Sequence, residues 1–125
     1  MRNLFALALM VAAFTGCGQD KQPIMSHGKP VGYWIDGLKD RDPIKRQKAV
    51  KALGHVGAAD PAAIPAVIEA LNDPQARVRA EAALALLNLG PAAKDAVPGL
   101  DKAQHDHDET VRLYARKALE RIRGT

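Results

Sequence analysis

The stretch that decides the fold runs from Ala58 to Gly90 and reads AADPAAIPAVIEALNDPQARVRAEAALALLNLG. Its apolar residues recur at intervals of three and four, as on one face of an α-helix, within Pro61–Leu71 and again within Gln75–Asn88. Asn72-Asp73-Pro74 separates the two segments as a turn. Gly90 is followed by proline, a pair that ends helices. The stretch therefore predicts a helix–turn–helix unit of 33 residues.

The same 33-residue pattern occurs three times without a gap, over residues 25–57, 58–90 and 91–123. Alanine recurs in frame at positions 49, 82 and 115 and at positions 52, 85 and 118, so the second helices can approach closely. Trp34 is in frame with Val67 and Leu100, which predicts that it is a core residue buried against the next repeat. Repeats of this size bury their apolar faces against their neighbours. The fold class expected for residues 30–125 is therefore all-α, an α-solenoid of three repeats.

Two charged residue types also recur in frame, an aspartate in each turn and an arginine six residues later. The carboxylates can accept hydrogen bonds from free N–H groups at the start of each second helix, and the guanidinium groups can reach turn carboxylates of their own and neighbouring repeats. We interpret these residues as a structural ladder rather than as an anionic-ligand site. The Asp–Arg ladder consists of Asp40, Asp73, Asp106, Arg46, Arg79 and Arg112.

The string V-R-x-x-A-x-x-A-L-x-x-L-G at Val78–Gly90, its in-frame echoes and the Asp-Pro turns resemble HEAT repeats, in particular the short HEAT-like type also found in the phycobilisome lyase family. The resemblance covers about Val31 to Arg123. It implies a solenoid whose second helices line a concave surface that holds other proteins. Ankyrin repeats share the period, but their T-P-L-H string is absent and the helices here are too long for them.

The N-terminus is predicted to be a secretion signal, with a positive start at Arg2 and an apolar run of ten residues, Leu4–Ala13. That run is shorter than the roughly 20 residues that cross a bilayer as a helix. The segment resembles a bacterial lipoprotein signal, which implies removal of residues 1–16 and lipidation of Cys17, the single cysteine. Gly18 after that cysteine, by the same resemblance, favours the outer membrane or the periplasmic face. Residues 17–29 then form the lipidated cysteine and a flexible tether.

The charge balance and residue content exclude several classes of function. Removal of residues 1–16 takes away Arg2 and no acidic residue, so the formal charge falls from +4 to +3, too small and dispersed for a nucleic-acid binder. No Ser or Cys nucleophile lies beside a base, and no glycine-rich phosphate loop occurs. His105 and His107 flank a ladder aspartate in the string His-Asp-His-Asp-Glu; metal binding is possible there, but a polar cap for the last helix is favoured. We therefore expect no enzyme activity, cofactor, metal or small-molecule substrate.

A partner-binding surface is expected on the second helices, at positions that point away from the core and differ between repeats. Leucine and tyrosine form an apolar centre there and cations form its rim, as in many binding patches, although the apolar residues could instead pack between adjacent helices. This predicted ridge consists of Lys48, Lys51, His55, Leu84, Leu113, Tyr114, Lys117 and Arg121.

The sequence as a whole predicts a lipid-anchored module that binds or scaffolds other proteins at a bacterial cell envelope. Two alternatives remain at this point. One is a HEAT-like enzyme or enzyme accessory, related to bilin lyases or dependent on a metal. The other is a structural subunit of an envelope complex that docks through the ends of its repeat stack.

Overall fold

The computed structural model describes residues 22–124. The predicted signal peptide, residues 1–16, and the predicted lipidation site Cys17 lie outside the described residues. Between residues 22 and 124, no helix combines the length and the apolar character needed to cross a membrane.

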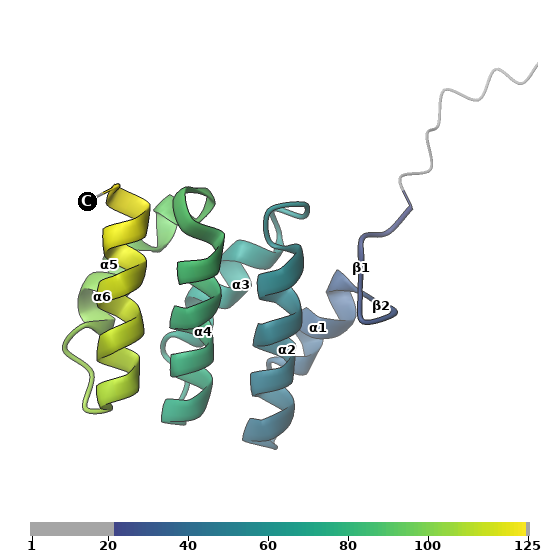
Figure 1. Cartoon of the computed structure of the whole chain (residues 1–125). Helices are drawn as coiled ribbons and strands as arrows, with labels where there is room; N and C mark the ends of the chain where they lie inside the picture. The colour runs from purple at the N-terminus through teal and green to yellow at the C-terminus, as the bar shows by residue number, and fades with distance from the viewer. Residues whose placement is uncertain (1–21, 125) are drawn as a thin grey trace, which may run out of the picture.

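The described chain folds as helical pairs that stack side by side (Figure 1). Helices α2, α4 and α6 form one layer, in which α4 packs between the other two, and α1, α3 and α5 form a second layer behind them. A short 3₁₀ helix, η1, leads from α4 into α5. The helices are α1 (Val31–Gly37), α2 (Pro43–Val56), α3 (Ala63–Ala70), α4 (Ala76–Leu89), η1 (Gly90–Ala96), α5 (Val97–Ala103) and α6 (Glu109–Arg123).

The helix boundaries lie close to those predicted. Helix α4 begins and ends one residue later than expected, and Gly90 ends it with a positive φ of 59° that favours glycine. Helix α3 begins two residues later than expected, because the Asp60 carboxylate accepts the Ala62 amide and holds the preceding residues in a turn.

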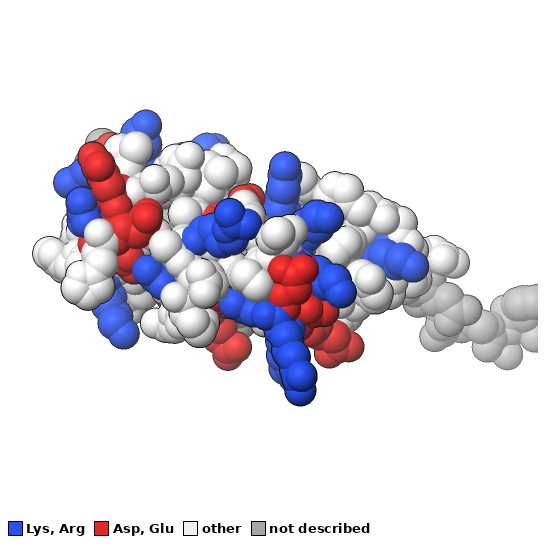
Figure 2. Space-filling view, turned by 90° about the horizontal axis from the view of Figure 1, so that it is seen from below, with Lys and Arg blue, Asp and Glu red and all other residues white. Residues whose placement is uncertain are grey.

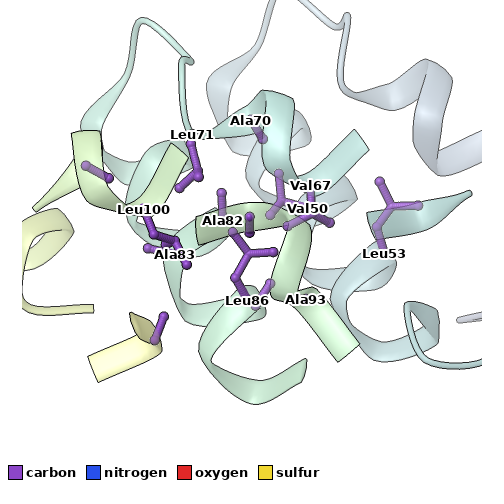
Figure 3. Close-up of a cluster of buried hydrophobic side chains, with 14 of the residues drawn as sticks. Val50, Leu53, Val67, Ala70, Leu71, Ala82, Ala83, Leu86, Ala93 and Leu100 are labelled. Carbon is purple, nitrogen blue, oxygen red and sulfur yellow. The ribbon is translucent and has the colours of Figure 1, made fainter. Parts of the chain in front are cut away.

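The apolar core runs along the interface between the two layers and between successive helices of the front layer (Figure 3). Leu53, Leu86 and Leu119, which are in frame, are all buried, and so are Val67 and Leu100 of the back layer. The alanines at positions 49, 82 and 115 are also buried, as their small size and their recurrence in frame predict. Each helical pair thus covers the apolar face of the next one.

The N-terminal edge of the stack differs from the prediction of a free tether. Met25–Ser26 (β1) and Lys29–Pro30 (β2) form a small antiparallel hairpin that packs against α2. The buried Ser26 hydroxyl donates a hydrogen bond to the Ala52 carbonyl at 3.0 Å. Residues 25–30 are therefore part of the folded domain.

Trp34 is only half-buried, unlike its buried in-frame counterparts Val67 and Leu100. Its indole Nε1 donates to the Ser26 carbonyl at 2.9 Å, and its ring meets those of His27 and Tyr33 edge to face. Trp34 packs against the core cluster, as expected of a core residue, but it is less buried than its counterparts. The reason is that Trp34 lies at the open N-terminal end of the stack, where the hairpin covers it instead.

Charged residues replace core residues at both ends of the stack. Positions 78 and 111 hold fully buried valines, whereas the in-frame residue of the first pair is the exposed Lys45. Positions 50 and 83 hold buried valine and alanine, whereas the in-frame residue of the last pair is the exposed Arg116. Polar outer faces of this kind keep terminal repeats soluble. Lys45 and Arg116 thus each place a charge where an interior repeat has an apolar contact.

Close packing of α2 on α4 predicts an asymmetry between two glycines. A methyl group added at Gly54 would lie 2.8 Å from the Ala85 Cβ, whereas one added at Gly32 has no neighbour within 4 Å. We expect Gly54→Ala to lower the free energy of unfolding by about 1–3 kcal/mol through overpacking. Gly32→Ala is the matched control and should keep or raise stability, because alanine favours helix. Urea denaturation followed by circular dichroism measures both, and equal stability of the two variants would contradict close packing.

Candidate functional site

The outward face of α2, α4 and α6 is the candidate site, because most of its predicted ridge residues are exposed. Most of the predicted ridge is exposed there, namely Lys48, Lys51, His55, Leu113, Lys117 and Arg121. Leu84 and Tyr114 are half-buried. The structure thus gathers the predicted residues on one face of the front layer, but its apolar centre is less exposed than expected.

Tyr114 contributes to packing as well as to surface, because it contacts the buried cluster. Its in-frame counterpart Glu81 shows the direction of this position, since the Gln47 amide of the preceding helix donates to the Glu81 carboxylate at 3.2 Å. Tyr114 is the equivalent residue of α6, the helix that packs against α4. Leu84 has no such place in the core cluster and lies in frame with the exposed Lys51 and Lys117. Leu84 rather than Tyr114 is therefore the apolar centre of the ridge.

Two residues of this face were missed by the sequence analysis. Ile44 is 48% exposed and lies one helical turn before Lys48 of the predicted ridge, and the exposed Arg77 lies two turns before Leu84. A signal was available, because the in-frame residues Ile44, Arg77 and Thr110 differ in character from one repeat to the next.

The charge of this face is predominantly positive. The face consists of five rows, each made of three residues that are 33 positions apart, and the rows start at positions 44, 47, 48, 51 and 55. Glu81 is the one acidic residue in these rows, and its carboxylate accepts a hydrogen bond from Gln47. The same rows contain the exposed Ile44 and Leu113 and the half-buried Leu84. The arrangement suits a ligand with acidic and apolar groups. The cations of the face are Lys48, Lys51, Arg77, Lys117 and Arg121.

The Asp–Arg ladder runs along the edge where α2, α4 and α6 begin, and Figure 2 views this edge with its interspersed acidic and basic side chains. Arg46 donates through Nε and Nη2 to both carboxylate oxygens of Asp73, at 2.8 and 3.1 Å. Arg79 holds Asp106 in the same way, at 2.8 and 3.0 Å. Each arginine therefore binds the carboxylate of the following turn, and the ladder joins consecutive pairs.

The same arginines also fasten their own turns. Arg46 Nη1 donates to the Asp40 carbonyl at 2.8 Å, and Arg79 Nη1 donates to the Asp73 carbonyl at 2.8 Å. The ladder carboxylates in turn accept the backbone amide two residues later, as Asp106 does from Asp108 at 2.9 Å. The predicted hydrogen bonds between these carboxylates and free N–H groups at the helix starts are confirmed.

The ladder alters the ionisation of its members. Burial opposes the charge of Asp106, but hydrogen bonds from Arg79 and from the Asp108 amide prevail and hold the pKa of Asp106 below its usual range. The hydrogen bond to Asp106 raises the pKa of Arg79 above its usual value. Both groups therefore stay charged near neutral pH, and the ladder is a fixed element of the fold rather than a proton donor or acceptor.

The His-Asp-His-Asp-Glu string is a helix cap in the structure. Asp108 accepts the Val111 amide at 3.0 Å as the N-cap of α6, and Glu109 lies in its first turn. His105 and His107 are exposed, and the Asp106 carboxylate between them is occupied by Arg79. Across residues 22–124, no three His, Cys, Asp or Glu side chains lie where they could hold one metal ion.

The ladder makes a testable prediction about stability in acid. Asp106→Asn should lower the free energy of unfolding at neutral pH by about 1–3 kcal/mol, since it leaves Arg79 without its charged acceptor. Because the folded pKa of Asp106 is depressed, its contribution is present above the unfolded Asp pKa and is lost as the pH falls through the folded value. Urea denaturation between neutral pH and pH of about 2 should show the wild type and the variant converging in acid. A constant difference would assign the effect to packing alone.

One comparison with known proteins bears on this arrangement. A family model for HEAT repeats matches residues 33–120, which is well over half of the chain. No curated protein matches the chain. The matched span contains the ladder, the buried alanines and most of the face of α2, α4 and α6. The chain therefore belongs to the HEAT-repeat family.

Proposed function

We propose that this protein is a non-catalytic binding or scaffolding module for other proteins, built as a three-repeat solenoid. HEAT repeats generally mediate protein–protein interaction, and the match over residues 33–120 supports this role. The observation that carries the proposal is the outward face of α2, α4 and α6. On that face exposed Lys51 and Lys117 flank Leu84, and no described contact of the fold uses the charges of these two lysines.

The proposal places the module at a bacterial cell envelope, anchored by lipid on Cys17. Its support is the sequence pattern of residues 1–17, which resembles a lipoprotein signal. Since residues 25–30 belong to the folded domain, the tether would shorten to the residues between Cys17 and β1. The binding face would then lie close to the membrane, on the outer membrane or at the periplasmic face.

Docking of an apolar partner on the stack ends, as in the structural-subunit alternative, has less support. Lys45 and Arg116 occupy end positions where interior repeats have buried apolar residues, so an apolar partner would have to bury these charges. No feature of the described residues specifically favours the enzymatic alternatives.

A charge reversal tests the binding face. We expect Lys51→Glu with Lys117→Glu, made in the full chain with a C-terminal affinity tag, to reduce capture of envelope proteins from the source membrane by about tenfold. Helicity and melting temperature should stay near those of the wild type, because both lysines are exposed. The matched control is Lys94→Glu with Lys102→Glu, which makes the same charge change outside this face. Equal loss with both pairs would reduce the effect to net charge and contradict a specific face.

The anchor is tested separately by replacing the predicted lipidation site. Cys17→Ser should release the protein from the membrane fraction, because the acyl chains that hold it there would be missing. Mass spectrometry of the mature N-terminus measures the modification directly. An unmodified Cys17, or an unprocessed N-terminus, would contradict the anchor and leave the binding proposal untouched.

A further inference from the structure

Two arginines of the Asp–Arg ladder, Arg46 and Arg79, use two separate sets of donors. Nη1 points back to the carbonyl oxygens of the arginine's own turn, and Nε and Nη2 point forward to a carboxylate of the next turn. The first set orients the guanidinium group, and the second set binds the acid in a bidentate manner. Arg46 and Arg79 repeat this arrangement with nearly identical distances. Arg46 and Arg79 therefore bind a carboxylate with the same geometry.

Arg112 has the first set of bonds and lacks the second. Its Nη1 donates to the Asp106 carbonyl at 2.7 Å and to the His107 carbonyl at 2.9 Å, so the guanidinium group is fastened as in Arg46 and Arg79. Within the described chain, no group accepts from its Nε or Nη2 and no salt bridge includes it. Arg112 thus presents an oriented, unfilled fork on the outer side of α6.

The surroundings of this fork favour an anionic group with an apolar neighbour. Arg116 lies one helical turn later and is exposed, and Leu113 beside Arg112 is 40% exposed. Asp101 of α5 is already paired with Arg123 of α6 at 3.0 Å. A preformed fork loses little side-chain freedom when it binds, which lowers the entropic cost of an added acid.

We propose that Arg112 is a binding residue for an aspartate or glutamate side chain of the protein partner, with Leu113 contacting an apolar side chain next to that acid. The inference rests on the proposed protein-binding function and specifies the partner's chemistry. The partner's carboxylate takes the place that Asp73 has on Arg46 and that Asp106 has on Arg79. Arg112 lies on α6, five residues before Lys117 of the binding face.

A second copy of the chain is a weaker occupant. Among the described ladder residues, Asp40 is the aspartate whose carboxylate binds no arginine, but this carboxylate lies 3.9 Å from the Lys45 ammonium group. A second copy stacked in register would also have to bury Lys45 where interior repeats have valine. In addition, the hairpin β1–β2 covers Trp34 and the Ala52 carbonyl at that end. These features oppose head-to-tail stacking.

The first test follows the arginine Nε–H resonances of the full chain by nuclear magnetic resonance. The probe is a blocked peptide with the sequence of residues 70–77, ALNDPQAR, which contains the turn aspartate that Arg46 binds in the fold. We expect the Arg112 resonance to shift saturably with this peptide, while the resonances of Arg46 and Arg79 stay in place. A matched peptide with asparagine at the position of Asp73 should leave Arg112 unmoved.

Three outcomes of this titration would overturn the proposal. Arg112 could respond no more than the exposed Arg41, the two peptides could act alike, or inorganic phosphate could shift Arg112 while the aspartate peptide does not. Self-association in sedimentation velocity that disappears with either Asp40→Asn or Arg112→Lys would assign the fork to a second copy and would also overturn it.

The second test uses partner capture with the tagged full chain. Arg112→Lys keeps the charge but removes the bidentate fork, and we expect it to lower capture by about tenfold relative to the exposed control Arg41→Lys. If Arg112→Lys captures like the wild type while Lys51→Glu with Lys117→Glu does not, this inference fails and the proposed function stands. If the charge reversal also leaves capture unchanged, the proposed function fails with it. Should Arg112→Lys disturb folding, the peptide titration of the wild type still decides the matter.

Discussion

The structure depends on an apolar face that no single helical pair can bury alone. A single pair would leave valine, leucine and alanine side chains in contact with water on the side that meets the next pair. In the stack these side chains are buried, including Leu53, Leu86 and Leu119. Burial of such side chains is the main favourable term in folding, at about 25 cal/mol per Å² of apolar surface. The molecule must therefore be read as an interface repeated along one axis, rather than as separate hairpins joined by linkers.

Small residues and the Asp–Arg ladder give that interface its register. Alanines and Gly54 let α2 and α4 approach closely, so the helices lack bulky side chains that would fix their relative height on that side. The ladder supplies a directional contact at the turn edge, where Arg46 and Arg79 each bind one carboxylate ahead and two carbonyls of their own turn. The net contribution of these ion pairs to the free energy of unfolding is small, because the loss of hydration offsets much of the attraction. Their main effect is on the register of the helices. Arg46 and Arg79 therefore have a structural role.

The residues left free by these two requirements define what the protein can do. The outward face of α2, α4 and α6 has cations around Leu84, and its one acid in the in-frame rows is bonded to Gln47. At the last pair, the ladder arginine repeats the fastening of its predecessors without a following carboxylate. The proposed binding function and the proposed acidic partner both arise from comparing equivalent positions along the repeats. The ladder arginine binds a carboxylate in the first two pairs and has no carboxylate partner in the described part of the third pair. This difference is informative because the fold orients the guanidinium group in the same way in all three pairs.

The sequence by itself determined the helical pairs, their turns and most of the core. These features follow from local periodicity and from identical residues at a spacing of 33, both of which can be read without knowing which pairs touch. The ladder residues and the helix cap at Asp108 were also predictable, because their chemistry acts within a few residues. Only the tertiary structure decided which turn each arginine binds, that Ser26 and Trp34 join the hairpin to the first pair, that Tyr114 leans into the core, and that Arg112 stays open. The physical reason is that these features depend on contacts between chain segments that are distant in sequence or at the ends of the stack, where the repeat pattern no longer specifies the neighbour.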